Sequence, residues 1–86
     1  MEKFLADGLA ELGPPDEGMF YIKLSIWDHS IKFMTKCIYV LLCSVADKDG
    51  VIEINRREFA KEQRVSLKQL DKAISDLIEL GFISKL

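Results

Sequence analysis

Cysteine, proline, histidine and tryptophan are all scarce in this sequence of 86 residues. It contains two cysteines, two prolines, one histidine and one tryptophan. Cys37 and Cys43 lie in a stretch with helical character, where their spacing puts them on different faces of a helix, so we expect two small buried thiols and no disulfide. These two cysteines and a single histidine are too few ligands for a structural zinc site.

Long apolar runs are also missing. No run approaches the roughly 20 residues that a membrane-spanning helix needs. The start of the chain, residues 1–4, carries Glu2 and no long apolar stretch, which is unlike a secretory signal. Apolar residues make up 49% of the chain and charged residues 30%. We therefore expect a single small globular domain at most, cytoplasmic and without a membrane partner.

No catalytic constellation can be recognised. His29 is the only histidine, and it lies beside Asp28 in a turn-like WDHS segment without a serine or cysteine partner in a known motif. The five glycines are scattered, so no phosphate-binding loop is expected. The turn at 47–50, DKDG, resembles the opening of a calcium loop, but Glu53 comes too early to be the closing carboxylate. The sequence therefore predicts a protein that is not an enzyme and has no metal or cofactor.

The charge is unevenly distributed along the chain. The net charge is −2, from 12 basic and 14 acidic residues. Residues 55–72 contain six basic against three acidic residues, a local charge of +3, so the rest of the chain carries −5. Residues 1–20 contain five acidic residues against one lysine. A basic element in an acidic chain favours an anionic partner for that element.

The first half of the chain predicts one buried helix between less regular segments. In residues 1–18, apolar side chains spaced near one helical face precede Gly13 and two prolines, so we expect an N-terminal tail or a short amphipathic helix, docked on another surface such as a second copy of the chain. Residues 19–27 alternate apolar and polar side chains and predict a strand. Residues 32–46 predict a largely buried core helix.

Residues 51–54 predict a short strand, which we expect to pair with the terminal FISKL segment and with the strand at 19–27. The stretch NRREFAKEQRVSLKQLDKAISDL then contains two helix-start signals in quick succession. Asn55 with Glu58, and Ser66 with Gln69, have the spacing of helix caps. The first predicted helix extends to about Gln63 and the second to about Leu80, and only a short corner separates them.

Gly81 suits the left-handed conformation that ends many helices. Two helices joined so closely cross steeply and share a core. The residues expected in that shared core are Phe59, Ala60, Val65, Leu70, Ala73, Ile74 and Leu77.

The stretch FAKEQRVSLKQLDKAISDLIELGFI resembles the winged helix-turn-helix family of prokaryotic DNA-binding proteins. The resemblance extends over residues 20–86. Over this range the chain is similar to the N-terminal domains of phage and plasmid replication-initiation proteins of the replisome-organiser or DnaD type. It implies a mainly α fold with a small β component, in which residues 19–86 form three core helices, short strands and an incomplete wing. FISKL supplies one wing strand, whereas the returning strand is absent, so the chain is a piece of a longer protein or its wing is completed elsewhere. The family often has glycine in the turn, where this chain has Gln63 and Arg64.

The resemblance implies sequence-specific binding of double-stranded DNA, in replication initiation or transcription regulation. A homodimer and a replication or transcription protein are the further partners it suggests. The second helix would enter the major groove. The expected base contacts are Ser66, Lys68, Gln69 and Lys72. The expected phosphate contacts are Arg56, Arg57, Lys61 and Arg64. The alternative is a winged-helix module for protein interaction or oligomerisation, in which these residues are ordinary solvated side chains.

Overall fold

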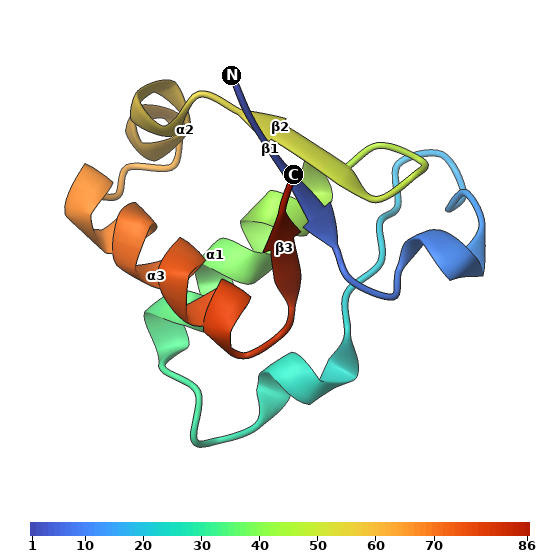
Figure 1. The fold of residues 1–86 in the computed structure, drawn as a ribbon, viewed down its shortest axis with the longest axis horizontal. Helices are drawn as coiled ribbons and strands as arrows, with labels where there is room; N and C mark the ends of the chain where they lie inside the picture. Colours follow the sequence, from blue (N-terminus) through green and yellow to red (C-terminus); the bar gives the residue numbers. More distant parts are fainter.

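The structure is a computed structural model that describes residues 1–86 apart from the side chain of Ala10. Within these residues, three α-helices lie against one face of a three-stranded antiparallel sheet (Figure 1). The elements in chain order are β1 (Glu2–Ala6), the 3-10 helices η1 (Ala10–Leu12) and η2 (Leu24–Trp27), α1 (Phe33–Ser44), β2 (Val51–Ile54), α2 (Arg56–Glu62), α3 (Leu67–Glu79) and β3 (Ile83–Lys85). The fold is therefore a small domain of helices and short strands.

The N-terminal segment forms the central strand of the sheet, in the order β2-β1-β3. Phe4 pairs with Ile52 on β2 and with Lys85 on β3. The expected tail or short amphipathic helix is therefore wrong for residues 2–6. Phe4 and Ala6 are both fully buried, so the repeat is that of a strand with one face on the core. The helical prediction combined apolar residues on both sides of Gly8. The chain turns away from the strand at Gly8, which has a positive φ of 79°, so these residues do not belong to one element.

The predicted strand at 19–27 is also wrong. Residues 19–23 have irregular backbone and residues 24–27 form η2. Ile26 is the buried residue of η2, whereas Leu24 is 77% exposed. The buried Tyr39 side chain holds this segment to α1, because its hydroxyl accepts a hydrogen bond of 3.0 Å from the Lys23 backbone N–H. Tyr21 and Ile22 pack partly against the core, whereas Met19, Phe20 and Trp27 are exposed.

The elements from residue 32 onwards are largely confirmed. The predicted helix at 32–46 is α1, the DKDG segment is a turn, and the predicted strand at 51–54 is β2. The carboxylate of Asp47 accepts hydrogen bonds from the backbone N–H groups of Asp49 and Val51. The expected pairing of β2 with FISKL is wrong, because β1 lies between β2 and β3. The central position of the sheet is thus filled by the N-terminal strand.

The core lies between the sheet and the helices. The ring of Tyr39 on α1 packs against that of Phe82, with ring centroids 5.1 Å apart. The predicted core of α2 and α3 is confirmed, with Val65 only partly buried. The side chains that fill the core are Phe4, Ala6, Leu9, Ile26, Ile38, Tyr39, Leu42, Cys43, Ile52, Ile54, Phe59, Ala60, Leu70, Ala73, Ile74, Leu77, Phe82 and Ile83.

Candidate nucleic-acid interface

A sharp corner joins α2 and α3. Asn55 caps the start of α2 by accepting a hydrogen bond from the Glu58 backbone N–H, as predicted. At its end, the Val65 N–H donates to the Ala60 carbonyl and the Arg64 N–H donates to the Lys61 carbonyl. These two bonds form a Schellman motif, which uses carbonyls that a helix end would otherwise leave without partners.

Arg64 adopts the left-handed conformation of that motif, with a φ of 58°. Gly81 has the same role at the end of α3, with a φ of 84° and the equivalent bond from the Phe82 N–H to the Leu77 carbonyl. The turn in which this chain lacks the expected glycine therefore has a backbone conformation that glycine favours. It directs the Arg64 side chain, which is exposed, away from the core.

Ser66 and Gln69 form a complete capping box at the start of α3. The Ser66 hydroxyl accepts from the Gln69 backbone N–H, and the Gln69 side-chain carbonyl accepts from the Ser66 backbone N–H, both at 3.0 Å. This cap was predicted, but it limits the role predicted for Gln69. A bidentate pair with adenine uses the same side-chain carbonyl, so such a contact would require the cap to open.

Lys68 and Lys72 lie one helical turn apart on the exposed side of α3. Together with Lys32, which precedes α1, they line a groove of about 280 Å³ between α1 and α3. Met34, Thr35, Gln69, Ala73 and Asp76 line the rest of it. Lys72 pairs with Asp76 at 3.2 Å, but its side chain is 66% exposed, so water screens this pair and it contributes little to stability. Three lysines from two elements thus surround one groove.

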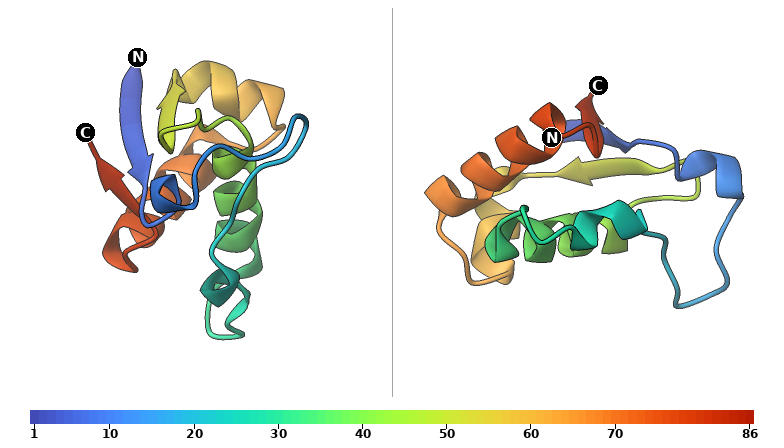
Figure 2. Two further views of the ribbon diagram at one scale, coloured as in Figure 1. Left: turned by 90° about the vertical axis from the view of Figure 1, so that its right-hand side faces the viewer. Right: turned by 90° about the horizontal axis from the view of Figure 1, so that it is seen from below.

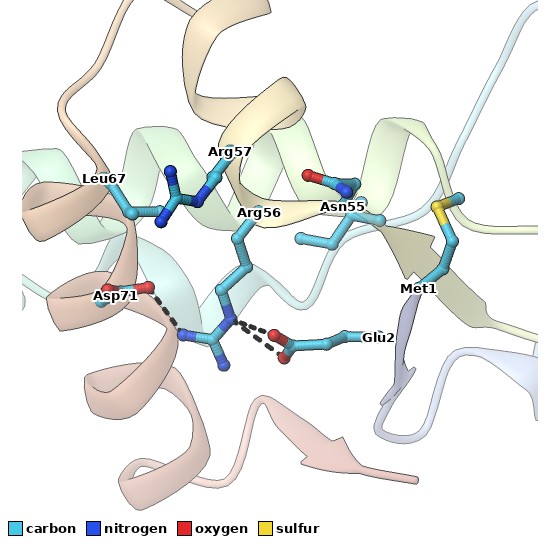
Figure 3. A pocket seen from close by; sticks show the side chains of 8 residues that line it. Met1, Glu2, Asn55, Arg56, Arg57, Leu67 and Asp71 are labelled. Atoms are coloured by element: carbon cyan, nitrogen blue, oxygen red, sulfur yellow. Dashed lines mark hydrogen bonds and ion pairs between the residues drawn. The ribbon is translucent and has the colours of Figure 1, made fainter.

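Arg56, a predicted phosphate contact, is instead held by carboxylates of two other elements (Figure 3). Its Nε lies 2.8 Å from a carboxylate oxygen of Glu2 on β1, and its Nη1 lies 2.7 Å from Oδ1 of Asp71 on α3. Its guanidinium is also 5.8 Å from the centre of the Phe4 ring. The hydrogen bonds to Asp71 and Glu2 raise the pKa of Arg56. Arg56 therefore joins β1, α2 and α3, and its charge is already neutralised.

Arg57, Lys61 and Arg64, the other predicted phosphate contacts, are all exposed on or just after α2. Arg57 lines an open groove of about 530 Å³ beside Arg56, and Figure 3 shows its guanidinium next to Leu67 at the start of α3. Among the ion pairs found within the described residues, none includes these three side chains. They are therefore available to an anionic partner.

Of the three lysines that line the groove, Lys32 is the one that sequence reasoning did not identify. It lies far from Lys68 in the sequence, and only the packing of α1 against α3 brings the two together. The only sequence signal for Lys32 was its position immediately before a predicted core helix, which is a weak one. The side chains that the structure describes contain no group of three or more His, Cys, Asp and Glu residues arranged to hold a metal ion.

Comparisons of the chain with models of protein families, with curated proteins and with solved structures found no match. Of the helices in the described residues, none combines the length and the apolar character that crossing a bilayer requires. The assignment of function therefore depends on the geometry described above.

Proposed function

We propose that this chain binds double-stranded DNA as a helix-turn-helix domain, in replication initiation or transcription regulation. The observation that carries the proposal is the groove between α1 and α3, which is lined by Lys32, Lys68 and Lys72. A surface with several lysines close together attracts a polyanion even when the net charge of the protein is negative. The turn between α2 and α3 leaves the start of α3, with Lys68, open to solvent.

Two of the three acidic residues of α3 are already paired, and the third, Glu79, is the last residue of the helix and does not line the groove. Asp71 is paired with Arg56, and Asp76 is paired with Lys72 through an exposed contact. A phosphate can replace the carboxylate in such an exposed pair at small cost. Lys68 remains unpaired among the ion pairs of the described side chains.

The geometry supports a division of contacts that differs in part from the sequence-based one. Lys68 and Lys72 are proposed to reach base edges, because both project from the exposed face of α3. Arg57, Lys61, Arg64 and Lys32 are proposed to contact phosphates, which set affinity and orientation without reading sequence. Arg56 has a structural role, while Ser66 and Gln69 hold the start of α3 in place.

Fluorescence anisotropy with a labelled duplex of mixed sequence tests this proposal. If about four phosphates are contacted, affinity should fall roughly 100-fold between about 0.05 M and 0.2 M salt. Lys68→Ala combined with Lys72→Ala should weaken binding at every salt concentration. Lys48→Ala combined with Lys85→Ala removes the same charge away from the groove and is the matched control. No binding at the lower salt concentration, or equal losses in the two double variants, would refute the proposal.

A second candidate function, a module for protein interaction, is favoured by exposed apolar side chains around the start of α1. Leu24 is 77% exposed, Trp27 53% and Phe33 78%. Side chains of this size on a free surface are typical of contacts with proteins. This function would appear as self-association or as binding to a replication or transcription protein, with no affinity for the duplex even at low salt.

A further inference from the structure

An exposed aromatic side chain marks the start of α1. Phe33, the first residue of α1, is 78% exposed. Lys32 precedes it, and Lys36 lies one helical turn further along, where the two side chains are neighbours on the helix surface. The nearby carboxylate of Asp28 accepts hydrogen bonds from the backbone N–H and the hydroxyl of Ser30. Phe33 is thus a large apolar side chain beside two positively charged side chains.

A small groove with the opposite charge lies beside the other end of α1. Its volume is about 170 Å³, and Glu53, Glu58 and Glu62 line it together with apolar side chains. All three glutamates are exposed, and lysine and arginine are absent from the described residues that line this groove. Val45, which follows α1 directly, is 47% exposed there. The remaining lining residues are Met1, Ile54, Asn55 and Phe59.

The two features lie at opposite ends of the same helix. Phe33 begins α1 and Val45 follows its last residue, so the helix separates them by about 18 Å at 1.5 Å per residue. Figure 2 (left) shows α1 extending from η2 at one end of the molecule to α2 and β2 at the other. Phe33 therefore cannot reach the groove of its own chain, but it can reach the groove of a second copy.

We propose that copies of this chain associate head to tail, with Phe33 of one copy seated in the groove formed by Glu53, Glu58 and Glu62 of the next. Lys32 and Lys36 then face the glutamates, and an exposed aromatic side chain is removed from water. Donor and acceptor are different surfaces, so the contact is heterologous and produces a ring or an open chain. The contact is small, so the association is weak and depends on salt.

This inference does not rest on DNA binding. Lys68 and Lys72 lie outside the proposed contact and remain exposed on α3. Lys32 is assigned to both contacts, so in a complex with DNA it serves either a phosphate or the neighbouring copy.

Sedimentation of the full chain at increasing concentration, with charge-reversed variants, tests the inference. One variant combines Glu58→Lys with Glu62→Lys, and another combines Lys32→Glu with Lys36→Glu. Each should lower the association constant by at least about tenfold, because like charges then meet across the contact. An equimolar mixture of the two variants should associate again, since each then offers a surface of opposite charge to the other. Phe33→Ser should also abolish association without changing any charge.

The matched control is Lys48→Glu with Lys85→Glu, which changes the net charge by the same amount at two exposed positions away from both surfaces. This variant should associate like the unmodified chain. Association should also weaken between about 0.1 M and 1 M salt, where the Debye length falls from about 10 Å to about 3 Å. A chain that stays monomeric up to about 1 mM, association that survives the reversals, or a mixture that fails to associate would each overturn the inference.

Discussion

Replacing Arg56 with alanine separates a structural role from a DNA-contacting role. The side chain is 25% exposed and pairs with Glu2 and Asp71, whose side chains are 38% and 48% exposed. Because both partners are partly solvated, we expect each ion pair to contribute about 1 kcal/mol to the free energy of unfolding, the upper end for exposed pairs. The contact with the Phe4 ring adds about 0.5 kcal/mol. Removing a positive charge from the first turn of α2 stabilises the helix by about 0.5 kcal/mol, because the helix dipole disfavours a cation there. We therefore expect Arg56→Ala to lower the free energy of unfolding by about 2 kcal/mol.

Thermal unfolding followed by circular dichroism measures this effect. For a domain of this size, a loss of about 2 kcal/mol lowers Tm by roughly 8–16 °C. The control is Arg57→Ala, which removes the neighbouring and exposed arginine and should leave Tm nearly unchanged. A double-mutant cycle with Glu2→Gln should give a coupling energy of at least about 0.5 kcal/mol.

In the DNA-binding assay, we expect Arg57→Ala to have the larger effect and Arg56→Ala the smaller one, the reverse of their effects on Tm. Arg57→Ala should lower the slope of log affinity against log salt concentration by about 1, the value for one phosphate contact. The folded Arg56→Ala variant should leave this slope unchanged. If Arg56→Ala keeps the Tm of the unmodified chain and loses a phosphate contact, the ion pairs with Glu2 and Asp71 do not hold in solution. The sequence-based role of Arg56 would then be correct.

Three further predictions concern the turn, the central strand and the thiols. Arg64→Gly should raise the free energy of unfolding by up to about 1 kcal/mol, because the φ of 58° is unfavourable for arginine; denaturant unfolding measures this, and a loss of stability would contradict it. Phe4→Ala should cost about 3–5 kcal/mol, because the side chain is fully buried; a change in Tm below about 4 °C would place residues 2–6 outside the core. Burial raises the pKa of the Cys43 thiol to about 11, so at pH 8 an alkylating reagent should modify the partly exposed Cys37 first, and equal rates would contradict the burial of Cys43. The raised pKa also means that the contribution of this thiol to stability is complete below about pH 8.5 and is lost as the pH rises towards 11.

The parts of the fold that the sequence predicted correctly depend on local interactions. Asn55, Ser66 and Gly81 act on backbone groups within a few residues of themselves, so the ends of α2 and α3 can be read from spacing alone. The core face of α3 also follows directly from its apolar periodicity.

The parts that the sequence did not predict depend on pairing between distant segments. Residues 2–6 are too few to distinguish a strand from a helical turn by periodicity, and their partners lie on β2 and β3. Arg56 looked available because its partners are distant in the chain, with Glu2 54 positions and Asp71 15 positions away. Only the α3 lysines of the groove were predicted, for the same reason, since Lys32 lies just before α1 and far from them in the sequence.

The central position of β1 has a consequence for the order of folding. β1 leaves the ribosome before both strands that pair with it. The hydrogen bonds from the Ser84 hydroxyl to the Asp7 carboxylate can form only after Ser84, 77 positions later, has been synthesised. Such long-range pairing is slow compared with helix formation. During synthesis, the helices can therefore form while Phe4 is still exposed to solvent, and a chaperone that recognises short apolar segments would have its best opportunity in that interval.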